Sequence, residues 1–334
     1  MPNPTVSVII PNYNHAPYLP ERIESILAQT YQNFELIILD DCSTDNSQTI
    51  IDCYAARDKR IRTASNTINS GSPFAQWNKG VLLAQGKYIW MAESDDYAHE
   101  TLLETLVSVL ERYTTVGLAY CQSYKVDKAG IVIGDGLPKD NINIDERRWL
   151  RSYQNNGTDE VVNYLIFKNI IPNASALLFR KSAYPLSEKA SAGLRLCGDW
   201  LTYVKMLEAN DIYYHPHKLN YFRVHNRTVR TKNTWSSIAV LRERAKIVQY
   251  ILEHFDVPAE NAIEAVRPIY HDYLLNLAKL SFRINNKHQY REVARFLKPF
   301  IRNQQLKREV YQALGKRLKN KVASYFSIST HAPS

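Results

Sequence analysis

Hydrophobic residues in the first 120 positions alternate between short runs and helical spacing. The run Val6–Ile10 is apolar and β-branched, and Pro11 ends it, which predicts a buried strand. The runs Leu36–Leu39, Ile61–Ala64 and Tyr88–Met91 predict three further strands. Apolar residues between these runs recur at helical spacing. This alternation predicts an α/β domain with a mostly parallel sheet flanked by helices.

Beyond the fourth strand, the pattern becomes mixed and then purely helical. We expect a hairpin in 117–133 that turns at Asp127–Gly130, and a long polar loop over 134–158. A strand at Ala174–Phe179, a helix from about Cys197 to Ala209 and a strand near Leu219–Val224 complete the domain. The expected C-terminal helices are 236–254, 259–284, 288–302 and 305–325. We therefore predict an α/β domain over 1–230 and an all-helical extension over 231–334.

The positive charge is concentrated in the predicted extension. The whole chain has a net charge of +9, but residues 226–334 hold 20 Lys and Arg against 8 Asp and Glu. Such asymmetry indicates an anionic partner, either a membrane surface or a nucleic acid. A solvated basic face explains it equally well.

The cysteines and the lengths of the apolar runs indicate in which cellular compartment to expect the protein. Cys42, Cys53, Cys121 and Cys197 show neither a CxxC pair nor zinc-site spacing, so we expect reduced thiols. Val6–Ile10 is too short for a signal peptide, and no run approaches the ~18 apolar residues of a membrane span. We expect a cytoplasmic protein, at most peripheral on the inner face of the cytoplasmic membrane.

Acidic residues follow two of the predicted strands. Asp40-Asp41 ends the second strand and Glu93-Ser94-Asp95-Asp96 follows the fourth. Ligands of parallel sheets bind beyond the carboxyl ends of the strands, so both clusters should face one crevice. Clustered carboxylates repel each other unless a cation or a ligand hydroxyl lies among them. Helix capping is the alternative, which we favour for Asp45 but not for Asp41 or Asp95.

Nucleotide-binding signatures of two common classes are missing from the sequence. No G-x-G-x-x-G follows the first strand, and no G-x-x-x-x-G-K-[ST] occurs. This argues against a dinucleotide oxidoreductase and against a P-loop kinase.

Four segments nevertheless occur in a recognisable order. They are Val8–Asn14 (VIIPNYN), Leu39–Asp45 (LDDCSTD), Asn78–Gly80 ahead of Gly86, and Glu93–Asp96 (ESDD). Their order and spacing, over about residues 4–225, resemble the inverting, nucleotide-sugar-dependent family 2 glycosyltransferases of the GT-A fold. The chain has Glu93 where the commonest family pattern has Asp, and Cys42 where it has Gly.

The resemblance implies a role for each matching position. Pro11 and Tyr13 would line the nucleobase pocket, Asp41 would bond the base, and Glu93 would lie near the ribose. The expected nucleotide-sugar-binding residues are Pro11, Asn12, Tyr13, Asp40, Asp41, Asn78, Glu93, Ser94, Asp95 and Arg223. A divalent metal, Mn²⁺ or Mg²⁺, would bind Asp95, with Asp96 and His225 as further candidate ligands.

Asp199 resembles the family's late acidic motif, which supplies the catalytic base. It lies in Cys197-Gly198-Asp199-Trp200, at the start of a predicted helix. A carboxylate there can take the proton of the acceptor hydroxyl as that oxygen attacks the anomeric carbon. Helix capping is the alternative for Asp199, and an ordinary structural histidine is the alternative for His225.

The resemblance implies a donor and an acceptor class. The donor would be a nucleotide-sugar, with a UDP-sugar as the default. The acceptor would be a glycan or a lipid-linked molecule, in surface polysaccharide synthesis. The alternative is a catalytically inactive, sugar-nucleotide-binding relative. A nucleic-acid binder has only charge in its favour, and we expect no nucleic-acid partner.

The last predicted helix has an apolar stripe surrounded by basic residues. The stripe recurs every four positions at Leu306, Val310, Leu314, Leu318, Val322 and Phe326. Such a helix can lie on an anionic membrane surface. Packing on the preceding helices or on a second copy of the chain explains it slightly better.

Overall fold

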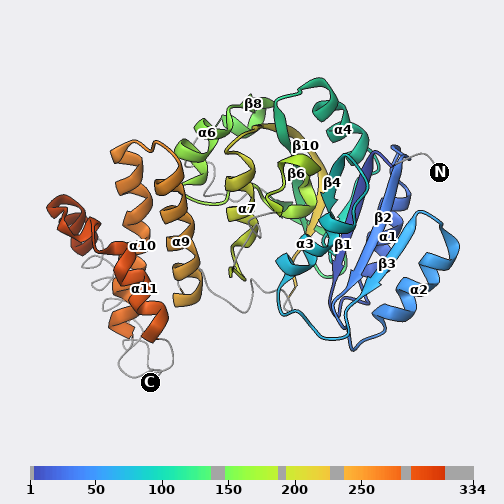
Figure 1. Cartoon of the computed structure of the whole chain (residues 1–334), viewed down its shortest axis with the longest axis horizontal. Helices are drawn as coiled ribbons and strands as arrows, with labels where there is room; N and C mark the ends of the chain where they lie inside the picture. Colours follow the sequence, from blue (N-terminus) through green and yellow to red (C-terminus); the bar gives the residue numbers. More distant parts are fainter. Residues whose placement is uncertain (1–3, 137–146, 187–192, 226–236, 280–286, 313–334) are drawn as a thin grey trace, which may run out of the picture. The chain divides into compact units, whose positions relative to one another are not determined.

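The computed structural model describes residues 4–136, 147–186, 193–225, 237–279 and 287–312. It consists of two compact units, Met1–Thr231 and Lys232–Ser334 (Figure 1). The second unit begins near the point where the sequence pattern changes to helices alone.

Four neighbouring strands of the ten-stranded sheet in the first unit are parallel, in the order β3-β2-β1-β4. These strands are β1 (Val6–Asn12), β2 (Phe34–Asp40), β3 (Ile61–Ser65) and β4 (Tyr88–Met91). Every residue of β1, β2 and β4 is buried, which explains their unbroken apolar runs. The helices α1 (Leu19–Leu27), α2 (Ser47–Arg57) and α3 (Pro73–Leu83) alternate with these strands along the chain (Figure 1).

Helix α3 approaches the sheet closely because Gly80 has no side chain. A Cβ atom at this position would lie 2.5 Å from Cγ2 of Ile9, in the middle of β1. The glycine therefore fixes the distance between α3 and the sheet.

The rest of the sheet is mixed. Strand β9 (Leu177–Arg180) runs antiparallel between β4 and β6 (Val116–Val126), and β10 (Asp211–Arg223) runs parallel to β6. The short strands β5 (Tyr97–Ala98), β7 (Val132–Asp135) and β8 (Tyr153–Asn155) add antiparallel pairs. The predicted α/β fold and the 117–133 hairpin are confirmed. The sheet is mixed, however, because β9 reverses direction beside the parallel strands.

The segment predicted as a loop over 134–158 contains regular structure. Within its described part lie a 3₁₀ turn at Arg148–Leu150, strand β8 and the start of α6 (Gly157–Glu160), which continues into a π-helical turn at Val161–Leu165. Side chains anchor it: Trp149 is buried, and the Tyr120 and Tyr153 hydroxyls lie 2.7 Å apart. These long-range contacts leave no periodic signal in the sequence.

Helices α4 (Leu102–Arg112) and α7 (Gly198–Met206) complete the main elements of the first unit. Helix α4 buries the apolar face that its spacing predicts, including Leu103, Leu106 and Leu110.

The second unit is helical where it is described. It contains α9 (Ile238–His254), α10 (Ala259–Lys279), α11 (Lys287–Leu297), a 3₁₀ turn at Phe300–Arg302 and a helical segment at 304–312. Leu306 and Val310 of the predicted stripe are buried. The stripe positions Leu314, Leu318, Val322 and Phe326 lie outside the described residues. Among the described helices, none has the length and apolar character needed to cross a bilayer.

Asp45 joins the start of α2 to the loop after β1. Its carboxylate accepts hydrogen bonds from the backbone N–H groups of Ala16 (2.9 Å) and Ser47 (3.0 Å) and from the Ser47 hydroxyl. Partial burial alone would raise the pKa of Asp45, but these bonds hold it below its ordinary value. Asp45 thus bonds the first residue of α2, although the N-cap position itself is Asn46, whose side chain makes no capping bond.

We predict that Asp45→Ala lowers the free energy of unfolding by ~1 kcal/mol at neutral pH. The pKa of Asp45 is lower in the folded chain than in the unfolded chain. The carboxylate therefore adds to the free energy of unfolding above the unfolded pKa of about 3.9, and this contribution disappears as pH falls below that value. Thermal unfolding at several pH values measures this. Asp52→Ala, at an exposed position of α2, is the control. Identical melting of the Asp45→Ala and wild-type proteins at neutral pH would contradict the prediction.

Candidate active site

The carboxyl ends of the parallel strands lie side by side. Asn12 pairs with Asp40 at the ends of β1 and β2, and Asp40 pairs with Ser65 at the end of β3. Glu93 follows the end of β4, the other neighbour of β1. The two acidic clusters therefore open onto the same edge of the sheet, where ligands of such sheets bind.

Asp40 organises the turn after β2. Its carboxylate accepts bonds from Nδ2 of Asn12 (2.7 Å) and from the backbone N–H (2.8 Å) and hydroxyl (2.6 Å) of Ser43. Cys42 lies in this turn with φ +63°, a conformation that favours glycine. The Oδ1 atom of Asn12 is buried and has no hydrogen-bond partner among the described residues. Asn12 thus has an acceptor to offer a ligand.

Asp41 holds the loop that leads into α3. Its carboxylate accepts bonds from Asn66 (2.6 Å), from the backbone and hydroxyl of Ser70 (2.9 and 2.7 Å) and from Gln76 (2.9 Å). Tyr13, just beyond β1, has a 47% exposed side chain. Its ring is a suitable stacking surface for a nucleobase, and the residue follows Asn12, whose backbone carbonyl accepts the N–H of Asp41 at 2.9 Å.

Two other predicted binding residues have structural contacts. Pro11 is buried within β1. Asn78 lies on α3, and its Oδ1 atom accepts a bond from the Tyr184 hydroxyl at 2.7 Å.

Three carboxylates crowd the loop after β4. Burial and the charges of Asp95 and Asp96 raise the pKa of Glu93 to about 8, although Nε1 of Trp77 donates to it at 3.0 Å. Burial and the charge of Asp95 raise the pKa of Asp96 to about 7, although it accepts the backbone N–H of Arg223 at 2.9 Å. The cluster is therefore a place where added positive charge is stabilising.

Asp95 differs from its neighbours because two imidazoles lie beside it. Burial opposes ionisation, but the hydrogen bond from His225 and the charges of His15 and His225 lower the pKa of Asp95. Nε2 of His225 lies 3.0 Å from Oδ2 of Asp95. His15, Asp95 and His225 each offer one ligand atom, and these atoms lie within 4.8 Å of one another. Two imidazoles and one carboxylate suit a divalent transition metal.

The two imidazoles are held in place by neighbours. Nδ1 of His15 lies 2.7 Å from the hydroxyl of Ser94, and the Tyr18 ring packs against His225 with centroids 4.9 Å apart. Such contacts orient metal-binding histidines. The structure thus groups His15, which sequence reasoning missed, with Asp95 and His225, and it places Asp96 against Arg223.

Arg22 on α1 lies buried near the acidic loop. Its guanidinium group is 4.9 Å from the centre of the Trp90 ring, and none of its nitrogens has a hydrogen-bond partner within the described part of the chain. Burial lowers its pKa to about 10, against the opposing charges of Asp96, Glu93 and Asp95. Arg22 therefore remains a cation that offsets the charge of the cluster from inside the protein.

Arg223, at the end of β10, is engaged within the protein. Its guanidinium group donates to the carbonyls of Asp95 (2.7 Å), Asp127 (3.2 Å) and Lys128 (3.0 Å) and pairs with Glu21. Only 2% of the residue is exposed. These bonds fix the acidic loop against β10, and a contact of Arg223 with a diphosphate stays a prediction.

Asp199 lies in the first turn of α7 and is half-buried. Its Oδ2 atom accepts a bond from Nδ2 of Asn169 at 3.0 Å. The helix N-terminus stabilises negative charge at this position. The geometry leaves the predicted role as catalytic base open to experiment.

Comparison with known proteins relates the first part of the chain to a family. Residues 7–169 match the model of glycosyl transferase family 2. Residues 7–169 of the chain belong to this family. The chain is 45% identical over 101 residues to glycosyltransferase GlyG of Streptococcus pneumoniae, covering 30% of this chain and 33% of GlyG. It is 39% identical over 110 residues to the putative teichuronic acid biosynthesis glycosyltransferase TuaG of Bacillus subtilis, covering 33% of this chain and 43% of TuaG. The matched segments therefore span less than half of these relatives.

Solved structures share the fold of this family 2 member. S. aureus TarS (residues 1–349) in complex with UDP-GlcNAc superposes with a TM-score of 0.65 at 18% identity, over 88% of this chain and 81% of that chain. The mannosyltransferase PcManGT of Pyrobaculum calidifontis, in complex with GDP-Man and Mn²⁺, gives 0.54 at 18% identity, over 95% of this chain and 80% of that chain. These likenesses confirm the GT-A fold.

We predict that Glu93→Gln stabilises the metal-free protein at alkaline pH. Folding raises the pKa of Glu93 to about 8, so the folded protein holds this proton more tightly than the unfolded chain. The resulting contribution to the free energy of unfolding is full below the unfolded pKa of about 4.3 and is lost as pH rises towards 8. The amide of the variant keeps an acceptor for Trp77 and has no proton to lose. Melting temperatures from pH 5 to about 9 should therefore fall less steeply in the variant. Parallel curves for the two proteins would contradict the prediction.

Proposed function

We propose that this chain transfers a sugar from a nucleotide-diphosphate donor to a hydroxyl of a glycan or lipid-linked acceptor, with inversion at the anomeric carbon. The observation that carries the proposal is the group formed by His15, Asp95 and His225, beside the carboxyl ends of the parallel strands. Family membership supports the reaction class. The name of TuaG supports a role in polysaccharide synthesis.

The nucleoside would bind at the ends of β1 and β2. Tyr13 offers an exposed ring. Asn12 offers its buried side-chain Oδ1 atom, which has no hydrogen-bond partner among the described residues. Asp41 offers a carboxylate that hydrogen bonds hold in place. A UDP-sugar is our proposed donor, because TarS, which shares this fold, was solved with UDP-GlcNAc.

His15, Asp95 and His225 fit a divalent cation by their chemistry and their spacing. A divalent cation held there would supply positive charge to stabilise the departing diphosphate. Two imidazoles favour Mn²⁺ over Mg²⁺, which prefers oxygen ligands. The chain's own residues prepare this place. Ser94 contacts His15 and Tyr18 contacts His225, which orients the two imidazoles. The buried guanidinium group of Arg22 offsets the charge of the acidic loop.

Asp199 would act as the general base. Asn169 donates to one of its carboxylate oxygens and so fixes the orientation of the group. As the acceptor hydroxyl oxygen bonds to the anomeric carbon, its proton passes to Asp199, and the bond from the sugar to the diphosphate breaks. Attack from the side opposite the leaving group inverts the anomeric centre.

We predict that Asp95→Ala abolishes sugar transfer and metal-dependent nucleotide binding, because it removes the charged member of the proposed ligand group. His15→Ala should weaken Mn²⁺-dependent UDP binding by at least ~10-fold, an effect of the size seen when a metal site loses supporting groups. Calorimetric titration of UDP with and without Mn²⁺ measures both. The surface variant Asp52→Ala should match the wild type. Full activity of Asp95→Ala would refute the metal assignment, and UDP binding without any turnover in the wild type would favour an inactive relative.

We predict a different result for Asp199→Asn. The amide keeps the bond to Asn169 through its oxygen but cannot accept a proton, so turnover should fall by ~100-fold or more. The affinity for UDP should be unchanged. Turnover at saturating donor and UDP affinity, measured together, separate the two effects. Lost affinity with unchanged turnover would make Asp199 a binding residue.

A further inference from the structure

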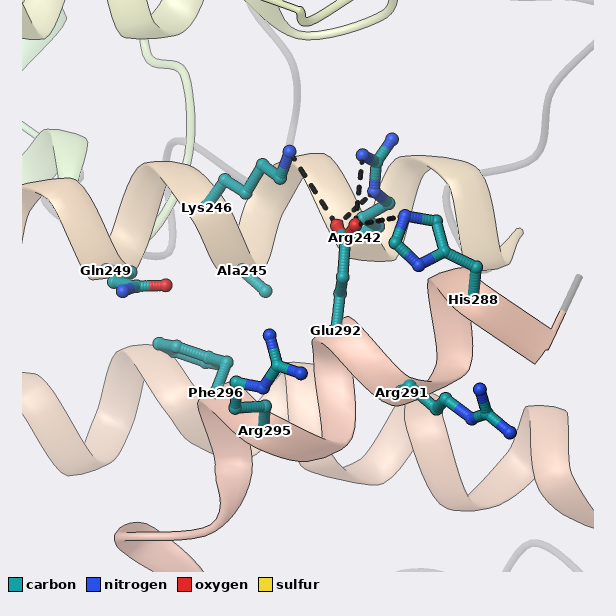
Figure 2. A pocket seen from close by; sticks show the side chains of 9 residues that line it. All are labelled: Arg242, Ala245, Lys246, Gln249, His288, Arg291, Glu292, Arg295 and Phe296. Atoms are coloured by element: carbon teal, nitrogen blue, oxygen red, sulfur yellow. Dashed lines mark hydrogen bonds and ion pairs between the residues drawn. The ribbon is translucent and has the colours of Figure 1, made fainter.

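A hollow of about 450 Å³ lies between α9 and α11 in the second unit (Figure 2). Its volume is within the range of about 300–1,000 Å³ that is typical of small-ligand sites. Its lining contains basic side chains from both helices: Arg242 and Lys246 from α9, and His288, Arg291 and Arg295 from α11. Glu292 is the one acidic residue among the lining residues, so the hollow carries an excess of positive charge.

Glu292 fixes part of this lining. Figure 2 shows Arg242, Lys246 and His288 directed toward its carboxylate. Arg242 forms an ion pair with it, Nε2 of His288 lies 2.7 Å away, and Nζ of Lys246 lies 3.7 Å away. One carboxylate thus holds groups from both walls, but it neutralises only one charge. Lys246, with 41% of its side chain exposed, is the more loosely held cation of α9.

The other two arginines of the lining are not buried by packing. Arg291 and Arg295 are exposed, one helical turn apart, whereas α11 buries Val293 and Leu297. Like charges at this spacing destabilise a helix. Both arginines also line an adjoining hollow with Lys298. Among the described residues, no ion pair to an acidic group is formed by Arg291, Arg295 or Lys298. An anion between them would relieve this repulsion.

We propose that the hollow between α9 and α11 binds a phosphate-bearing anion, either a soluble diphosphate or the headgroup of an anionic lipid. Phosphate oxygens accept the paired hydrogen bonds that guanidinium groups donate, and Lys246 supplies a further point charge from the opposite wall. Ala245 and Phe296 close the hollow with apolar surface, which leaves recognition to the charged groups. The site is built from the second unit alone, so it is independent of the proposed transfer reaction.

The test uses the full chain and substitutes one cation of each wall. Lys246→Gln and Arg295→Gln, singly and together, are compared with Arg308→Gln, an exposed basic position outside the hollow. Inorganic pyrophosphate is titrated by calorimetry in metal-free buffer. Flotation with phosphatidylglycerol vesicles, against phosphatidylcholine vesicles, tests the lipid source. UDP titration with Mn²⁺ confirms that each variant is folded and that its first unit is intact.

Each hollow variant should weaken pyrophosphate binding by about tenfold, the effect of losing one charge-assisted contact. Arg308→Gln should bind like the wild type. The melting temperature of Arg295→Gln should stay equal or rise, because a repulsion is removed; a merely structural arginine would lower it. Parallel loss of vesicle flotation identifies a lipid headgroup, and its retention identifies a soluble diphosphate.

Three results would overturn the proposal. The first is equal pyrophosphate affinity and equal flotation in all proteins. The second is an equal loss in Arg308→Gln, which would indicate diffuse charge attraction without a site. The third is binding of an RNA oligonucleotide without binding of either phosphate probe.

Discussion

Negative charge held in a partly dehydrated loop is the constraint on which the first unit depends. Glu93, Asp95 and Asp96 lie within four positions after β4, and together they could not all ionise without compensation. The compensation comes from different elements: the guanidinium of Arg22 on α1, and the imidazoles after β1 and β10. The approach of α1 and of the end of β10 to the loop after β4 is therefore also an electrostatic arrangement. The same residual negative charge makes the loop receptive to a cation.

The second unit has the opposite imbalance. Residues 232–334 hold 18 basic and 8 acidic side chains, and cations from α9 and α11 line one hollow. An excess of charge with no use in packing costs stability, and such costs often accompany function. The two proposed sites are thus of opposite sign, one receptive to a cation and the other to an anion. By these proposals, a cation together with the donor diphosphate would bind one part of the polypeptide, and a phosphate-bearing anion would bind the other.

Sequence patterns predicted the features that repeat locally. The buried strands β1, β2 and β4 and the acidic positions after them followed from apolar runs and strand ends. The antiparallel course of β9 did not, because strand direction depends on contacts remote in the chain. His15 looked like any loop histidine, because its partner Asp95 lies far along the sequence. Arg22, on a helix with polar positions, gave no sign that it is buried. Asp199 was found through a motif alone, and its function still depends on that motif.

The order of the chain also has a consequence for synthesis. His15, Asp95 and His225 come from the beginning, the middle and the end of the first unit, and the last two are 130 positions apart. His225 follows β10, whose partner β6 leaves the ribosome long before it. A nascent chain folds from its N-terminus as it emerges, so the acids of the β4 loop are in place before the second imidazole exists. A chain that terminates after Asp96 and before His225 keeps the acids and lacks that imidazole.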